Sequence, residues 1–207
     1  MIEKKDIEET FAHFLSMIED EEIKGKVVDA WLLGCKIGGW QNMNELRQMP
    51  FTLLTDCKGI NFIEHTLAVT EGALQLAKAQ EKQYSVMPYN IDYDRLVAGG
   101  LLHDVGKLLE ISKNNGEGFT KSHSGKCMRH PISGAILAAE VNLPEEIVNV
   151  IACHAKEGDG RPQVLETVFV HQADFATFNP LVMMTKDTLI RKDDKNIKKD
   201  KGVLKNG

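Results

Sequence analysis

The fold is decided by residues 101–107, Leu101-Leu102-His103-Asp104-Val105-Gly106-Lys107. This stretch places a histidine, an aspartate and a lysine at the end of an apolar run, where a buried carboxylate needs a charged partner. Neighbouring residues on a helix project about 100° apart, so one ion can bind both His103 and Asp104 only where the helix ends or turns. Gly106 predicts such a break. The pair therefore indicates a divalent cation, and the alternative is a capped or salt-bridged structural pair.

Four further helical segments each carry an isolated histidine or aspartate. With the pair above they make six candidate metal ligands: His65, His103, Asp104, His130, His154 and Asp174. Imidazole and carboxylate ligands suit Fe, Mn, Zn, Co or Ni. Because six ligands exceed what one ion needs, we expect two divalent metal ions. Ligands spread over five helices are typical of a metal site in the core of a helical bundle.

Composition narrows the class of protein. The chain has 207 residues, of which 43% are hydrophobic and 27% charged, values typical of a globular domain. We expect a cytoplasmic protein without a membrane segment, because no apolar run approaches the ~20 residues that span a bilayer. The net charge of −5 argues against binding to a nucleic-acid backbone. The four scattered cysteines form no C-x-x-C pair, which argues against a zinc knuckle or a redox motif.

The pattern predicts an all-α fold, a helical bundle with an N-terminal helical cap and almost no strand signals. Residues 1–59 form the cap, with two amphipathic helices ending at Gly38-Gly39, and an irregular connection over 40–59 that lines the site. Residues 60–180 form the metal-binding domain. Residues 181–207 are a charged tail that we expect to be disordered.

Start signals define the helices of the metal-binding domain. Asn61 with Glu64 in the capping-box position begins one helix, and others are predicted over 92–103, 132–141, 144–154 and 164–178. Gly99 and Gly100 predict a close approach between helices. The segment 112–126, rich in glycine and asparagine, is predicted to be a mobile loop beside the site.

The order His65, His103-Asp104, His130, His154, Asp174 resembles the HD-domain superfamily of metal-dependent phosphohydrolases over about residues 60–178. The shared motifs are HDxGK at 103–107 and His-Pro-x-x-Gly at 130–134. The resemblance implies that His65, His103 and Asp174 hold one ion, that His130 and His154 hold the other, and that Asp104 bridges them.

Asp104 and Lys107 are the candidate catalytic residues. Two cations ~3.5–4 Å apart generate a bridging hydroxide at neutral pH and orient a phosphoryl group. Lys107, one turn after His103 if the helix continues, would stabilise charge on a phosphate oxygen, and the alternative is a solvated surface lysine. Arg129, Arg161 and His171 are weaker substrate-binding candidates, with ordinary surface or incidental side chains as the alternative.

The expected substrate is a nucleotide or another small phosphate ester, cleaved as a monoester or a diester. Cyclic-di-guanylate phosphodiesterases of this superfamily carry a second histidine and a Gly-Tyr-Pro signature. Here Ala155 follows His154, and Asp159-Gly160-Arg161-Pro162 stands in the place of the signature. The difference argues against that activity and against a third metal. The motifs also resemble ribonuclease Y and symmetrical dinucleoside tetraphosphatases. Two rivals stay open: a mixed-valent di-iron oxygenase similar to inositol oxygenase, and a nucleotide-sensing module without catalysis. The oligomer is also open, with a homodimer as one option.

Overall fold

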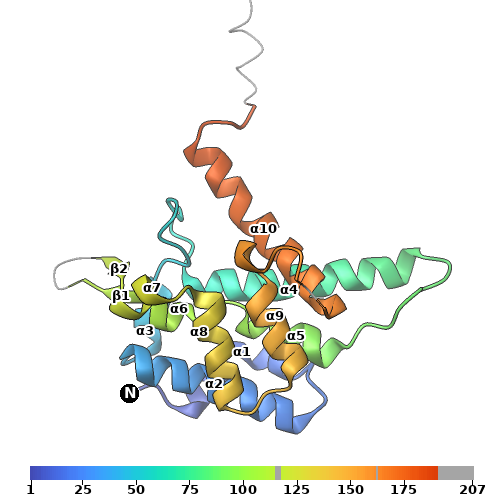
Figure 1. Cartoon of the computed structure of the whole chain (residues 1–207), viewed down its shortest axis with the longest axis horizontal. Coiled ribbons are helices and arrows are strands. Elements are labelled where there is room, and N and C mark those ends of the chain that lie inside the picture. The colour runs from blue at the N-terminus through green and yellow to red at the C-terminus, as the bar shows by residue number, and fades with distance from the viewer. Residues whose placement is uncertain (115–117, 162, 191–207) are drawn as a thin grey trace, which may run out of the picture.

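The structure is a computed structural model that describes residues 1–114, 118–161 and 163–190, and it is almost entirely helical (Figure 1). The N-terminal part contains α1 (Lys4–Leu15) and α2 (Glu21–Gly38), which confirms the two predicted helices. Asp20 caps α2 by accepting hydrogen bonds from two backbone N–H groups of its first turn. Gly39 ends α2 with a φ of 78°, a left-handed conformation that favours glycine.

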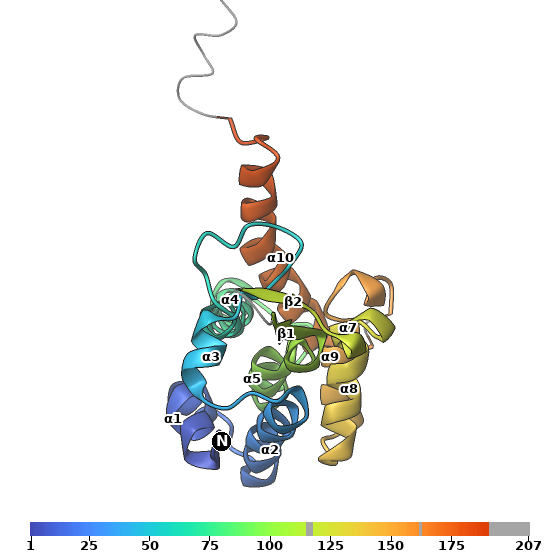
Figure 2. The same ribbon diagram turned by 90° about the vertical axis from the view of Figure 1, so that its left-hand side faces the viewer.

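The N-terminal helices share a core with the helices that follow. Trp31 of α2 is fully buried, with its ring centroid 4.8 Å from that of Phe11 and 5.3 Å from that of Phe62. Its Nε1 donates a hydrogen bond to the carbonyl of Leu101, 3.0 Å away. Figures 1 and 2 show α1 and α2 below α4 and α10, with α8 beside α2. The cap therefore supports the helix that leads into residues 101–107.

The predicted bundle is present. Its main helices are α4 (Phe62–Gln83), α5 (Tyr93–Leu102), α8 (His130–Glu140), α9 (Glu145–Cys153) and α10 (Leu165–Thr185). The capping box at the start of α4 is confirmed: the backbone of Glu64 donates to Asn61 Oδ1, and the backbone of Asn61 donates to Glu64 Oε2, each over 3.0 Å. A short 3-10 helix, η1 (Lys156–Gly158), follows α9.

Two glycines of α5 allow the close helix contacts that the sequence predicts. A Cβ atom at Gly99 would lie 2.6 Å from Val150 Cγ1 of α9, and one at Gly100 would lie 2.9 Å from Thr70 Oγ1 of α4. Such distances are too short for a larger side chain. The glycines thus bring α4 and α9 close to the end of α5, where His103 follows.

Part of the structure differs from the prediction. The predicted mobile loop over 112–126 largely forms an antiparallel pair, β1 (Ile111–Lys113) and β2 (Phe119–Lys121), followed by α7 (His123–Cys127). Phe119 stabilises the pair by stacking on Trp40, with ring centroids 6.3 Å apart. Residues 115–117 lie outside the described residues. The predicted irregular connection likewise contains a short helix, α3 (Met43–Gln48), whose Leu46 is buried.

The last helix is longer than predicted. α10 passes through Pro180 and ends at Thr185, so residues 181–185, which the prediction places in the tail, are helical. Leu181 is buried. Its burial offsets the loss of the backbone hydrogen bond that a proline removes from a helix. Residues 191–207 of the predicted tail lie outside the described residues. Within the described ranges, every helix is too short or too polar to cross a lipid bilayer.

Candidate metal centre

His103 and Asp104 lie in the turn between α5 and α6 (Lys107–Glu110), as the sequence predicts. Gly106 serves a different purpose from the one inferred from the sequence. Its φ is −64°, which any residue can adopt, so glycine is not needed to break the helix. A Cβ atom there would lie 2.1 Å from the carbonyl oxygen of His130. Gly106 is therefore required for contact with the start of α8.

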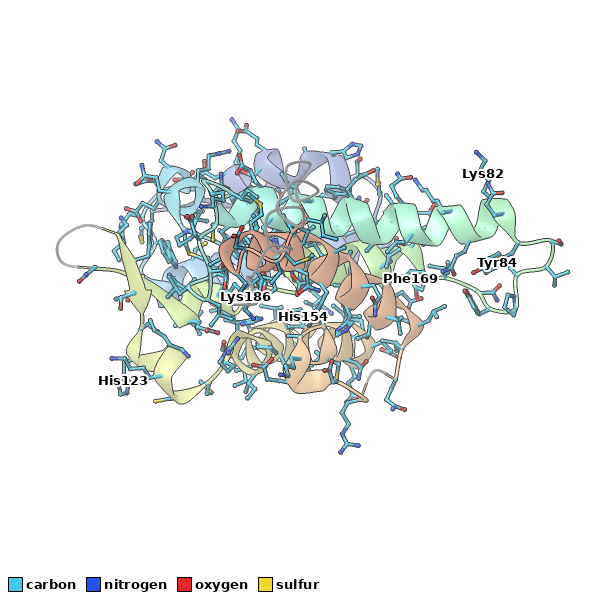
Figure 3. All side chains as sticks on the ribbon, turned by 90° about the horizontal axis from the view of Figure 1, so that it is seen from above. Lys82, Tyr84, His123, His154, Phe169 and Lys186 are labelled. Atoms are coloured by element: carbon cyan, nitrogen blue, oxygen red, sulfur yellow. The ribbon has the colours of Figure 1, made fainter. Side chains whose placement is uncertain are left out.

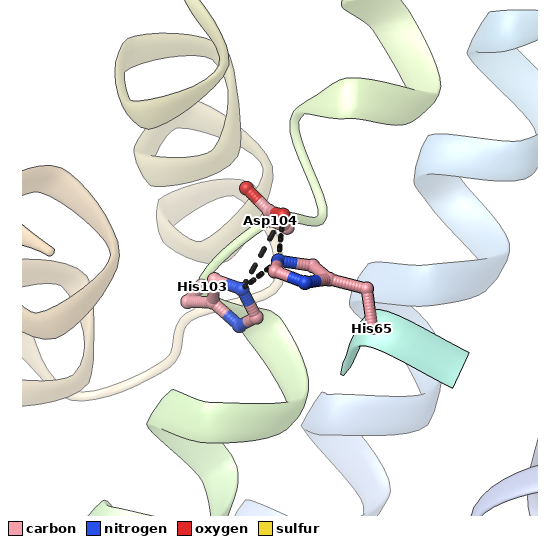
Figure 4. A group of neighbouring side chains, drawn as sticks. All are labelled: His65, His103 and Asp104. Atoms are coloured by element: carbon pink, nitrogen blue, oxygen red, sulfur yellow. Dashed lines mark hydrogen bonds and ion pairs between the residues drawn. The ribbon is translucent and has the colours of Figure 1, made fainter. Parts of the chain in front are cut away.

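One group of side chains gathers around the Oδ2 atom of Asp104 (Figure 4). His65 Nε2 from α4 lies 3.2 Å from this oxygen, and His103 Nε2 lies 3.3 Å from it. The two Nε2 atoms are 3.5 Å apart. Asp174 of α10 joins the group, with its Oδ1 atom 3.2 Å from His65 Nε2. Four of the six predicted ligands thus meet here.

A second group gathers around the other oxygen of Asp104. His130 is the first residue of α8 and His154 directly follows α9. Their Nε2 atoms lie 3.2 and 3.6 Å from Asp104 Oδ1 and 3.3 Å from each other. Figure 3 shows His154 near the centre of the molecule. Asp104 therefore presents one oxygen to each group of histidines.

All four histidines direct an Nε2 atom into the centre, because each Nδ1 atom has another partner. Nδ1 of His103 and of His154 lies 2.7 Å from a backbone carbonyl, of Gly100 and Ile151 respectively. A carbonyl only accepts hydrogen bonds, so Nδ1 carries the proton. His65 Nδ1 faces Thr177 Oγ1 at 3.4 Å, and His130 Nδ1 faces a carboxylate oxygen of Glu110 at 3.1 Å.

This arrangement fits divalent cations. Burial lowers the pKa of His130 to about 4, although Asp104 partly offsets the effect, so this imidazole is neutral at pH 7. Its free Nε2 lone pair then faces a carboxylate oxygen and another imidazole nitrogen, which repel it. Among the described residues, the buried Asp104 Oδ1 has no hydrogen-bond partner. A cation between these atoms would satisfy the nitrogen and the oxygen together.

Lys107 is not the solvated surface lysine of the alternative interpretation. It is 9% exposed, and its Nζ atom lies 2.5 Å from Asp104 Oδ2. Burial alone would raise the pKa of Asp104, but the Lys107 ammonium holds that pKa well below its usual range. The same Nζ atom lies 5.6 Å from the centre of the Phe51 ring, within the range of a cation–π contact. Phe51 in turn stacks on His65, with centroids 4.1 Å apart.

Sequence reasoning missed Glu110. Its Oε2 atom accepts a hydrogen bond from the backbone N–H of His130 over 2.6 Å and faces Nδ1 of the same residue at 3.1 Å. Burial raises the pKa of Glu110, but His130 and Arg129 outweigh it and lower that pKa to about 2. The only signal in the sequence is an acidic residue directly after Leu108-Leu109.

A cavity of about 390 Å³ opens onto the metal centre, with Lys107, His130 and Asp174 among its lining residues. Its apolar lining includes Phe51, Leu53 and Leu54 from the connection before α4, and Phe175 and Phe178 from α10. Besides Lys107, its basic lining comes from the hairpin and from the segments that flank α8 and α9: Lys121, Arg129 and Lys156. Its acidic lining residues are Glu110, Glu157 and Asp174. The connection before α4 thus lines the site, as the sequence predicts.

The three weaker substrate candidates differ in position. Arg129 lines the cavity and pairs with Glu110 and Glu157 over 3.3 and 3.4 Å. Arg161 is exposed and is not among the lining residues, so its predicted role has no structural support. His171 is not among the lining residues of the cavity, and its Nδ1 atom lies 2.6 Å from the carbonyl of His154. It therefore contacts the backbone of a candidate metal ligand.

Several known proteins are similar to this chain. Dihydroneopterin 2',3'-cyclic phosphate phosphodiesterase of Methanocaldococcus jannaschii is 34% identical over 115 residues, which cover 55% of this chain and 45% of that protein. An uncharacterized protein of the same organism is 25% identical over 119 residues, 58% of this chain and 59% of its own length. Ribonuclease Y of Borreliella afzelii is 39% identical over 74 residues, 36% of this chain and 12% of that protein.

The chain thus spans about half the length of the first two relatives and much less of the third. No solved structure gives a significant match. The profile of the HD domain matches residues 62–175, more than half of the 207 residues and all of the segment that carries the two groups of histidines. This chain therefore belongs to the HD domain family.

Proposed function

We propose that this protein is a metal-dependent hydrolase of phosphate esters. In this proposal His65, His103 and Asp174 hold one divalent ion, His130 and His154 hold a second, and Asp104 binds both. The observation that carries the proposal is the position of Asp104, whose Oδ2 atom faces the first pair of histidines at 3.2 and 3.3 Å and whose Oδ1 atom faces the second pair at 3.2 and 3.6 Å.

The residues of the site have separate tasks. Bound ions would activate water and stabilise the charge that develops on a phosphoryl oxygen. The histidines keep their orientation because their Nδ1 atoms are held by other groups. Lys107 lies between Asp104 and the cavity, so its ammonium can donate a hydrogen bond to a phosphate oxygen of a bound ester.

The cavity favours a small substrate. Its volume of about 390 Å³ lies near the lower end of the ~300–1,000 Å³ typical of small-molecule sites. The apolar lining suits a planar ring, and the basic lining suits an anion. The relative with 34% identity is named for a 2',3'-cyclic phosphate diester. We therefore place cyclic phosphodiesters of a single nucleoside or a similar heterocycle first among the substrates to test.

The test is a hydrolysis screen with defined metals. Protein stripped of metal is reloaded with Mn, Fe, Co, Ni or Zn, and its metal content is measured. It is then assayed with 2',3'-cyclic mononucleotides, 5'-mononucleotides, a dinucleoside tetraphosphate and bis(p-nitrophenyl) phosphate. We expect hydrolysis by protein that holds two ions.

Each rival function predicts another outcome of the same screen. Protein with two irons that consumes oxygen, shows a mixed-valent electron paramagnetic resonance signal and hydrolyses no ester would be an oxygenase. Protein that binds a nucleotide tightly with every metal, but turns over no ester, would be a sensor. Either result contradicts the proposal.

A further inference from the structure

Glu110 connects the metal centre with the basic lining of the cavity. Its Oε2 atom contacts His130 twice, at the backbone N–H over 2.6 Å and at ring Nδ1 over 3.1 Å. Its Oε1 atom faces Nε of Arg129 at 3.3 Å and Nζ of Lys121 at 3.9 Å. The side chain of Glu110 is only 13% exposed. One carboxylate thus holds a histidine with one oxygen and two cations with the other.

The Nδ1 contact sets His130 apart from the other three histidines. The Nδ1 partners of His103 and His154 are backbone carbonyls, and that of His65 is a threonine hydroxyl. A carboxylate is a stronger acceptor than either. It draws the Nδ1 proton more strongly, which makes Nε2 a better electron donor to a metal and prevents the ring from turning.

The two metal positions also differ in the number of side chains that they offer. The position at His65 and His103 has Asp174 and one oxygen of Asp104 besides the two imidazoles. Among the residues that the structure describes, the position at His130 and His154 has only the other oxygen of Asp104. Each ligand therefore contributes a larger share of the affinity at the second position, and the orientation of His130 has more influence there.

We propose that Glu110 is a positioning residue for the second metal position: it holds His130 so that an ion can bind between His130, His154 and Asp104. The inference rests on the proposed function, because it takes His130 as a ligand. It predicts that losing the Glu110 charge weakens one metal position and leaves the other intact. Losing a group that hydrogen-bonds a metal-binding histidine typically reduces metal affinity by ~10–100-fold.

The experiment compares two glutamates that contact the same arginine. Glu110→Gln keeps the shape of the side chain and removes its charge. Glu157→Gln is the matched control, because Glu157 also pairs with Arg129, over 3.4 Å, whereas the carboxylate that contacts His130 Nδ1 is that of Glu110. Titration calorimetry with Mn²⁺ or Co²⁺ and metal analysis after dialysis give the affinity and stoichiometry of each full-length variant.

For Glu110→Gln we expect one ion bound as in the wild type and the other ~10–100-fold more weakly, while Glu157→Gln binds both ions normally. Equal losses in the two variants would show that the effect acts through Arg129 and would overturn the proposal. Unchanged binding by Glu110→Gln, or equal weakening of both ions, would also overturn it. A wild-type protein that binds no metal would instead refute the proposed function itself.

A second comparison separates positioning from folding. Glu110 also accepts the backbone N–H of His130, so its loss could loosen the start of α8. Glu110→Asp retains the charge and should weaken the second position less than Glu110→Gln. In a His130→Ala background, adding Glu110→Gln should cause no further loss of affinity. A further loss of similar size in that background would refute an action through His130, whatever the stability of the single variant.

Discussion

Gly106→Ala tests whether the turn at residues 103–106 must pack directly against α8. The added Cβ atom would lie 2.1 Å from the carbonyl oxygen of His130, 2.5 Å from the backbone nitrogen of Gly134 and 2.7 Å from Ser133 Oγ. Non-bonded atoms prefer ~3.5–4.0 Å, so α8 must shift by about 1 Å or more. Two of the three contacts involve backbone atoms, which cannot rotate away.

The expected loss of stability follows from this overlap. Overpacking a core costs ~1–3 kcal/mol, and we take the upper end, about 3 kcal/mol, because the backbone of α8 must move. In a protein of this length 1 kcal/mol shifts Tm by ~2–4 °C, so Gly106→Ala should lower Tm by ~6–12 °C. His130 moves with α8, so the variant should also bind the second ion more weakly.

Thermal unfolding of the metal-free protein, followed by circular dichroism, measures the effect. Gly25→Ala is the control, since Gly25 lies inside α2 and a Cβ atom there would meet nothing within 4 Å. Alanine is the better helix former by ~0.5–1 kcal/mol, so this variant should melt slightly above the wild type. A Tm for Gly106→Ala equal to that of the wild type would refute the packing argument.

Three further predictions concern single side chains. Asp104→Asn should lose both ions in metal analysis, because an amide offers one neutral oxygen, and a variant that keeps two ions would refute the bridging role. Lys107→Met should keep both ions but lower kcat/KM for the best ester by about 100-fold, the typical effect of one lost donor; unchanged kinetics would exclude a role for its charge. At pH 8 Ellman's reagent should label the exposed Cys127 rapidly and not Cys35, because burial raises the pKa of the Cys35 thiol to about 12, and rapid labelling of Cys35 would contradict its burial.

The sequence predicts much of the bundle because polar residues stand out within apolar helices. His65, His154 and Asp174 each interrupt a run that would otherwise be core, and the structure brings all three to the same centre. Local signals also predict the start of α4, since the capping box between Asn61 and Glu64 lies within four residues of sequence.

What the sequence does not predict depends on contacts between distant segments. Glu110 contacts His130, twenty positions away, and Phe51 stacks on His65 from outside the bundle. In the sequence Glu110 looks like an ordinary acidic residue and Phe51 like an ordinary core residue. The strands β1 and β2 have three residues each, too few for an alternating pattern to be recognised. The predicted last helix ends at 178, but the burial of Leu181 lets α10 continue past Pro180.

The spread of the candidate ligands from position 65 to position 174 has a consequence for the stability of the whole chain. Ions bound there would cross-link α4, α8, α9 and α10 to the turn after α5, joining segments that are far apart in sequence. A ligand that binds only the folded state at 1,000 times its Kd adds about 4 kcal/mol to the free energy of unfolding. Chelators should therefore lower the melting temperature as well as the activity, so the metal supply would determine the fraction of the protein that is folded.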